Sequence, residues 1–134
     1  MNTTYFKNCV AGNVFQAKTT PALPTEYYIG LSSTPPAADG TGVTEPSTGA
    51  GYARVKLESL SEPVDGVTSN TDRISFNEST AAWSTIPYFV VYDSAAVGEG
   101  NLLMFEALDV QRSIEQGTIL SFKPGTLVLS VCDM

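Results

Sequence analysis

Residues 86–93, IPYFVVYD, and residues 101–108, NLLMFEAL, decide the fold predicted for this chain of 134 residues. Both runs carry apolar side chains at successive positions, so a strand formed by either run presents apolar groups on both faces. Strands of this kind are normally covered on both sides. The residues between them, VGEG at positions 97–100, have the composition of a turn and predict that the two strands form a hairpin.

Shorter runs on either side of this hairpin also follow the two-residue period of a strand. We expect a first strand around Tyr27, Ile29 and Leu31, and a second over residues 51–57, GYARVKL. The other expected elements are a tight turn at residues 63–66, a short strand at residues 74–76, and a closing hairpin of residues 118–122 and 126–131 around a turn at residues 123–125. About seven strands at this spacing predict an antiparallel β-sandwich.

The N-terminal region changes to the period of a helix, and apolar residues at helical spacing predict a short α-helix over residues 4–17. The apolar stripe consists of Phe6, Cys9, Val10, Val14 and Ala17, and the helix cap is expected at Asn2, Thr3 or Thr4. The predicted fold is therefore mainly β, with one short N-terminal α-helix. We expect a single domain over residues 1–134, with the helix and a linker in residues 1–20 and the β-sandwich in residues 26–132.

Acidic residues outnumber basic residues, with 14 Asp and Glu against 7 Lys and Arg and a net charge of −7. The basic residues are scattered along the sequence, so no cluster predicts binding to a nucleic acid or to an anionic membrane. No apolar run is long enough to span a bilayer, and the N-terminus lacks the pattern of a secretion signal. We therefore expect no nucleic-acid or membrane partner, and synthesis in the cytoplasm without a signal peptide.

The chain has no histidine, which removes the commonest general base and the commonest metal ligand. Most carboxylates stand in loops beside Gly, Ser and Thr, where they are expected to shape turns, and the loop acids Asp39 and Glu45 are expected to lack a partner. Glu106 interrupts an apolar strand, which indicates either an edge position or a buried salt bridge with Arg54 or Arg112. We expect no enzymatic activity, no cofactor and no metal.

The two cysteines, Cys9 and Cys132, stand near opposite ends of the sequence. Burial of both as small apolar side chains is the favoured interpretation. A disulfide that joins them is the alternative.

Several side chains of the apolar strands are expected at a contact surface, because an exposed strip of them would invite aggregation. The candidate contact residues are Tyr52, Trp83, Tyr88, Tyr92 and Met104. Trp83 is the only tryptophan, and it is expected either in the core or at a subunit interface, with stacking on a sugar ring as the alternative. We expect the N-terminal helix to cover part of this strip and a neighbouring subunit to cover the rest.

Four segments in a fixed order span nearly the whole chain: residues 4–24, TYFKNCVAGNVFQAKTTPALP; residues 27–57, YYIGLSSTPPAADGTGVTEPSTGAGYARVKL; residues 73–93, RISFNESTAAWSTIPYFVVYD; and residues 100–108, GNLLMFEAL, with a Gly-, Phe- and Leu-containing closing segment. In this order the chain resembles a family of small bacteriophage virion proteins commonly labelled phage tail fibre proteins. The resemblance brings no catalytic set of residues with it.

The resemblance implies a non-enzymatic structural component of a phage virion, of tail-fibre or baseplate type, that acts by oligomeric assembly. Its expected partners are further copies of the chain, in a trimer or a ring, and other virion proteins. A capsid decoration protein, or a module that binds a host receptor or surface glycan, are the alternatives. The long loop from Ser33 to Ala50 is expected at a contact surface, with its partner and the position in the particle left open.

Overall fold

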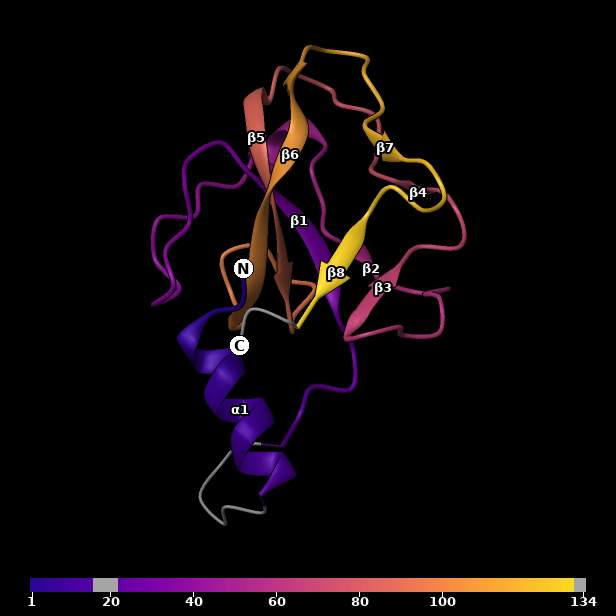
Figure 1. Ribbon diagram of the computed structural model, residues 1–134. Helices are drawn as coiled ribbons and strands as arrows, with labels where there is room; N and C mark the ends of the chain where they lie inside the picture. Colours follow the sequence, from indigo (N-terminus) through magenta and orange to yellow (C-terminus); the bar gives the residue numbers. More distant parts are fainter. Residues whose placement is uncertain (16–21, 132–134) are drawn as a thin grey trace.

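The computed structural model describes residues 1–15 and 22–131. Figure 1 shows one α-helix, a central sheet and two smaller sheets beside it. The helices are α1 (Thr4–Val14) and the short 3-10 helix η1 (Thr48–Ala50). The strands are β1 (Tyr28–Ser32), β2 (Val55–Lys56), β3 (Val67–Ser69), β4 (Ile74–Ser75), β5 (Ser84–Tyr92), β6 (Leu102–Ile114), β7 (Ser121–Phe122) and β8 (Val128–Ser130). The predicted mainly β, antiparallel sandwich with one short N-terminal α-helix is confirmed, with eight strands in the described residues.

The central sheet has the strand order β2-β1-β5-β6, with antiparallel neighbours throughout. The predicted β5–β6 hairpin is confirmed, and Val91 lies opposite Met104 in it. Asp93 holds the connecting turn, because its carboxylate accepts hydrogen bonds from the backbone N–H of Asn101 at 2.7 Å and from the side-chain amide of Asn101 at 3.0 Å. The two-stranded sheets β3–β8 and β4–β7 lie on one side of the central sheet (Figure 1).

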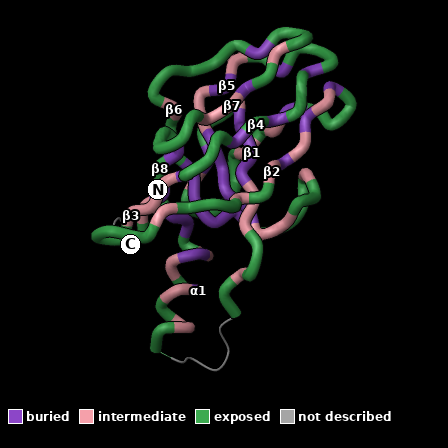
Figure 2. Tube along the Cα trace, turned by 90° about the vertical axis from the view of Figure 1, so that its right-hand side faces the viewer, coloured by how far each residue is buried: buried purple, intermediate pink, exposed green. Residues whose placement is uncertain are grey.

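The hairpin is apolar on both faces, and each face has its own buried cluster. One face contributes Phe89 and Val91 to the main core, which it shares with buried residues of the smaller sheets. The other face carries a second cluster of Val90, Tyr92, Leu102 and Phe105, against which Val43 packs. Val43 lies between Ser33 and Ala50, so the long loop packs against this second face. Figure 2 shows these buried stretches at the centre of the body.

The predicted closing hairpin is wrong, because β7 pairs with β4 and β8 pairs with β3. The turn between them is present, since the N–H of Thr126 donates to the carbonyl of Lys123 at 3.1 Å. Asn70 is buried between the strands, where its side chain accepts from the N–H of Leu127 at 2.9 Å and donates to the carbonyl of Lys123 at 3.0 Å. The Asn70 side chain therefore binds backbone N–H and C=O groups that would otherwise pair with each other in a hairpin.

The second strand is shorter than residues 51–57, because Tyr52 interrupts the pairing. The Tyr52 hydroxyl accepts the N–H of Leu31 at 2.9 Å, which takes the place of a strand partner. The sixth strand continues past Leu108 to Ile114 across a bulge, with Ile86 opposite Arg112 but Tyr88 opposite Ala107. The bulge lies opposite Pro87, which has no N–H to donate.

The helix begins where the sequence predicts and ends three residues earlier. Thr3 is the N-cap, and its side chain accepts a hydrogen bond from the N–H of Phe6 at 3.2 Å. Phe6 and Cys9 are buried, but Val14 is exposed rather than part of the apolar stripe. Ala17 lies outside the described residues. No helix of the described chain is long and apolar enough to cross a membrane.

Candidate functional site

The long loop, defined as residues 33–50, folds back on itself and is hydrogen-bonded to the start of α1. The N–H of Ser33 donates to the carbonyl of Thr44 at 2.9 Å, and the N–H of Ala37 donates to that of Thr41 at 2.8 Å. At the tip, the Asp39 carboxylate accepts from the N–H of Thr41 at 3.0 Å, as an acid that shapes a turn does. The N–H of Thr4 donates to the carbonyl of Ala38 at 2.9 Å, which joins the loop to the start of α1.

A buried ion pair fastens the base of this loop. Arg54 Nη2 donates to Glu45 Oε1 at 2.6 Å and Arg54 Nε donates to Glu45 Oε2 at 3.0 Å, so the pairing is bidentate. The side chain of Arg54 is 0% exposed and that of Glu45 is 6% exposed. The expectation that Glu45 lacks a partner is therefore wrong.

Arg54 also reaches the turn of the β5–β6 hairpin. Its Nη1 donates to the carbonyl of Ser94 at 2.8 Å and to that of Glu99 at 2.9 Å. The guanidinium lies 3.7 Å from the centre of the Tyr92 ring, within the range of a cation–π contact. One side chain thus links the long loop, the strand β5 and the hairpin turn.

Tyr52 completes this network at the edge of β1. Its hydroxyl donates to Glu45 Oε2 at 2.6 Å while it accepts the N–H of Leu31. Burial, and then the negative charge of Glu45, raises the pKa of the Tyr52 hydroxyl far above its ordinary value, so the hydroxyl keeps the proton that it donates. The sequence run EPSTGAGYAR, residues 45–54, therefore encodes the network, because it carries Glu45, Tyr52 and Arg54.

Gly30 is the position in β1 against which this network packs. A Cβ atom at Gly30 would lie 2.6 Å from the Tyr52 hydroxyl and 3.0 Å from Glu45 Oε2. We expect Gly30→Ala to lower the free energy of unfolding by about 1–3 kcal/mol through overpacking. Urea denaturation checks this, with Gly49→Ala as the control, because a Cβ at Gly49 meets nothing closer than 3.4 Å. Equal effects of the two substitutions would contradict the expectation.

A groove lies on the other side of the molecule, between β6 and β8, and we call it the β6–β8 groove. It has a volume of about 670 Å³. Its floor is apolar and includes Phe89, Met104, Leu120 and Leu129. Its walls are formed by residues 106–112 of β6, apart from Gln111, and by residues of β7, β8 and the turn between them.

The fold brings three basic residues to this groove that are far apart in the sequence. They are Arg73, Arg112 and Lys123, and all three are exposed. The sequence showed its basic residues as scattered, and no spacing in it indicates this grouping. Glu106 lies on the same groove, where its exposed carboxylate pairs with the N-terminal amine. The predicted edge position of Glu106 is thus confirmed, and in the described residues its salt-bridge partner is neither Arg54 nor Arg112.

The structure places the five candidate contact residues mostly inside the chain. Tyr52, Trp83, Tyr92 and Met104 are buried, with exposed fractions between 2% and 8%, and only Tyr88 is half-buried. The Trp83 indole donates to the carbonyl of Ala50 at 2.9 Å, so it also fastens the end of the long loop. These four side chains are buried within the single chain, and their contact with a partner stays a prediction.

The structure also describes Cys9 and the predicted turn at residues 63–66. Cys9 is buried, as the favoured interpretation predicts, and Cys132 with any disulfide lies outside the described residues. Asp65 and Gly66 have φ values of 53° and 78° and form a tight turn closed by mutual hydrogen bonds between the backbones of Val64 and Val67. Within residues 1–15 and 22–131, no group of three His, Cys, Asp or Glu side chains comes together as a metal site.

The comparison with known proteins agrees with the order of these features. A search of curated proteins finds no match. The family model of the Podophage GP4 fiber I protein gp80 matches residues 2–130, nearly the full length of the chain. The matched region includes α1, the long loop with its Arg54–Glu45 pair, and all eight strands. The chain therefore belongs to the family of podophage GP4 fiber I proteins, and it is a structural component of a phage virion.

Proposed function

We propose that this protein is a non-enzymatic subunit of a phage fibre and that it acts by assembling into a homo-oligomer, either a trimer or a ring. Family membership supports the fibre location. The network around Arg54 supports a structural rather than a catalytic role, because its one acid, Glu45, is bound by Arg54 and Tyr52. Other virion proteins are the further partners in this proposal.

The observation that carries the assembly proposal is the exposed apolar end of α1. The helix projects from the lower end of the β body in Figures 1 and 2. Val14 is 62% exposed and Phe15 is 82% exposed. Large apolar side chains grouped at the end of a projecting element are typical of a protein–protein contact.

A second copy of the same helix is the partner that the helix favours. An isolated helix of 11 residues is marginal in water, so α1 needs packing beyond its buried residues Phe6 and Cys9. Lys7 is the only charged side chain between Thr4 and Val14, so little charge repulsion opposes the approach of another copy. Side-by-side packing of helix ends is compatible with the cyclic symmetry of a trimer or a ring.

Light scattering coupled to size-exclusion chromatography tests this proposal. We expect the wild-type chain to have the mass of an oligomer, and Phe15→Ser to weaken assembly by about tenfold, because the substitution removes an apolar contact. The free energy of unfolding is expected to change by less than about 0.5 kcal/mol, since the side chain is exposed in the single chain.

Ile119→Ser is the control, because Ile119 is 57% exposed on a loop away from the helix. A wild-type chain that stays monomeric at every concentration would overturn the proposal. An oligomer that Phe15→Ser leaves intact would place the contact elsewhere.

The alternatives have less support. A glycan-binding module would expose Trp83 for stacking, and its burial and its hydrogen bond to Ala50 count against that role. A capsid decoration protein differs in position rather than in chemistry, and imaging of the assembled particle at side-chain resolution separates the two.

A further inference from the structure

The first three residues of the chain show how an extended segment fits beside β6. Asn2 bridges to Met104, the N–H of Thr3 donates to the carbonyl of Leu103 at 2.9 Å, and the N–H of Phe105 donates to the carbonyl of Met1 at 2.9 Å. On its other side, the Asn2 amide donates to the carbonyl of Ser130 in β8 at 3.1 Å. The N-terminal residues therefore fill the first part of a strand-wide gap between β6 and β8.

The gap continues past these residues as the β6–β8 groove. β6 is the last strand of the central sheet, and β8 pairs only with β3 among the strands of the described chain. Along the edge strand of an antiparallel sheet, every second residue points its backbone N–H and C=O outward. After Leu103 and Phe105, Ala107 is the next residue that does so. The groove thus offers an open strand edge above an apolar floor, an arrangement that accepts an added strand.

The charges of the groove select an acidic occupant. Arg73, Arg112 and Lys123 line it, while its acids are Glu106, which pairs with the N-terminal amine, and Asp109. In the whole chain acidic residues are twice as numerous as basic residues, whereas in the groove basic residues outnumber acidic ones. An extended segment with acidic and apolar side chains complements both the rim and the floor.

The chain carries such a segment at residues 58–65, ESLSEPVD, which we call the acidic segment. Its acids Glu58, Glu62 and Asp65 are exposed, and its apolar residues Leu60 and Val64 are 39% and 68% exposed. Residues 60–64 of it run alongside the stretch around β3, and the N–H of residue 61 donates to the carbonyl of residue 69 at 2.8 Å. Ser59 and Asp65, near its two ends, have positive φ values of 54° and 53° and bend the chain there. No basic residue occurs between positions 57 and 72.

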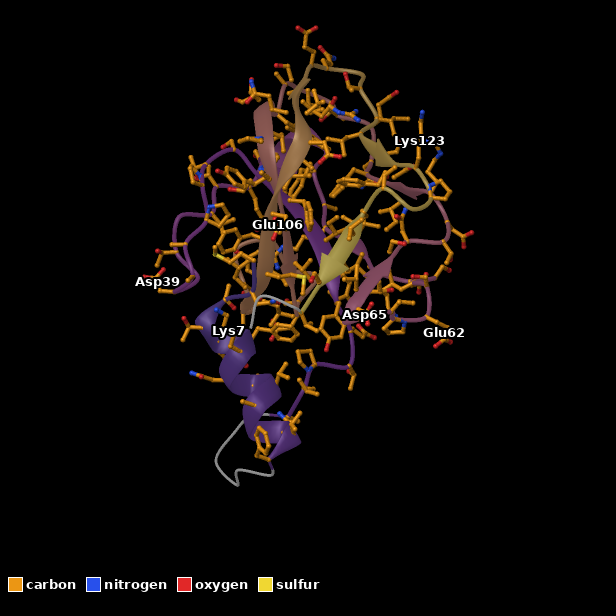
Figure 3. All side chains as sticks on the ribbon, viewed as in Figure 1. Lys7, Asp39, Glu62, Asp65, Glu106 and Lys123 are labelled. Atoms are coloured by element: carbon orange, nitrogen blue, oxygen red, sulfur yellow. The ribbon has the colours of Figure 1, made fainter. Side chains whose placement is uncertain are left out.

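We propose that the β6–β8 groove is the docking site for the acidic segment of a second copy of this chain, an inference that rests on the proposed homo-oligomer. Figure 3 shows Glu62 and Asp65 well apart from Lys123 on the same chain, so the contact joins two copies. The two surfaces are different, which makes the contact head-to-tail. Contacts of that kind close into cyclic assemblies where the rotation permits, so this contact is compatible with both the trimer and the larger ring.

A charge-swap experiment tests the docking. Arg112→Glu/Lys123→Glu reverses the rim of the groove, and Glu58→Lys/Glu62→Lys reverses the acidic segment. Each double variant is expected to weaken self-association by about tenfold to a hundredfold, because like charges then face each other. An equimolar mixture of the two is expected to recover self-association in sedimentation, because the acidic groove of one variant complements the basic segment of the other. A ring with an even number of subunits recovers the wild-type mass, whereas a trimer keeps one mismatched contact and recovers in part.

The control Glu78→Lys/Glu115→Lys carries the same net charge as the acidic-segment variant, and its two exposed acids lie outside the groove and the acidic segment, so it is expected to assemble as the wild type does. Wild-type assembly that survives both reversals overturns the docking and leaves the proposed homo-oligomer standing, whereas a monomeric wild type overturns the homo-oligomer itself. Groove variants that assemble normally but fail to enter particles would assign the groove to another virion protein and overturn the second copy as its occupant.

Discussion

Arg54→Met is expected to lower the free energy of unfolding by about 3–5 kcal/mol. The substitution removes the cation from a pair in which neither side chain is more than 6% exposed, so the Glu45 carboxylate is left buried opposite an apolar group. It also leaves the carbonyls of Ser94 and Glu99 without their donor. Loss of a partner from a buried pair costs more than the pair itself contributes, because the remaining charge is desolvated without compensation.

Urea denaturation at a fixed protein concentration measures this effect, since assembly makes the apparent stability depend on concentration. The matched control is Lys56→Met, which breaks the exposed pair of Lys56 and Glu26 at 3.5 Å, with side chains 46% and 51% exposed. We expect the control to cost less than about 1 kcal/mol. Similar losses for the buried and the exposed pair would show that the Arg54 network does not hold the loop.

The double variant Arg54→Met/Glu45→Leu separates the ion pair from the uncompensated charge. We expect it to recover a large part of the loss, because an apolar pair of similar volume replaces both charges. Recovery remains incomplete, since Tyr52 loses the acceptor of its hydroxyl and the Ser94 carbonyl still lacks a donor. The coupling energy between the two positions is the quantity to report.

The sequence predicts the central hairpin well, because the two-sided apolar runs at residues 86–93 and 101–108 leave few alternatives. It does not predict where the short strands pair. Thr118 to Val131 has the pattern of a hairpin, but its two strands pair instead with β4 and β3, and the buried side chain of Asn70 binds the backbone of Lys123 and Leu127 between them, more than fifty residues away along the chain. Long-range polar contacts of this kind have no local signature.

The candidate contact residues show the same limit. Large aromatic side chains on two-sided strands fit a core and an interface equally well. The sequence does not show that Tyr52 and Trp83 pack in the main core, or that Tyr92 belongs to the cluster against which Val43 of the long loop packs. The motif EPSTGAGYAR was visible in the sequence, but Glu45 and Arg54 are not at the spacing of a helical or strand pair. Grouping of Arg73, Arg112 and Lys123 on one groove depends on the tertiary fold alone.

Trp83→Ala is expected to cost about 3–5 kcal/mol of the free energy of unfolding, because it opens a cavity in the main core. Trp83 is 3% exposed and lies edge-on to the ring of Tyr52, with centroids 5.4 Å apart, and to that of Phe76 at 6.5 Å. Its indole also donates to the carbonyl of Ala50, which ends η1 and the long loop. Trp83→Phe keeps most of the volume and loses this donor, so a smaller cost of about 1–3 kcal/mol is expected.

Trp83 and Arg54 therefore fasten the long loop at two points, Ala50 and Glu45, and both substitutions should free the same segment. Hydrogen exchange can observe this directly, as faster exchange of the N–H groups of Ser33 and Ala37 in both variants, with β5 and β6 less affected. A contact role for Trp83 gives the opposite result, in which Trp83→Ala changes the mass of the oligomer and leaves unfolding and exchange as in the wild type. Because the chain has one tryptophan, the wild-type fluorescence adds a second test: a buried indole is expected to emit at short wavelength and to be insensitive to glycans.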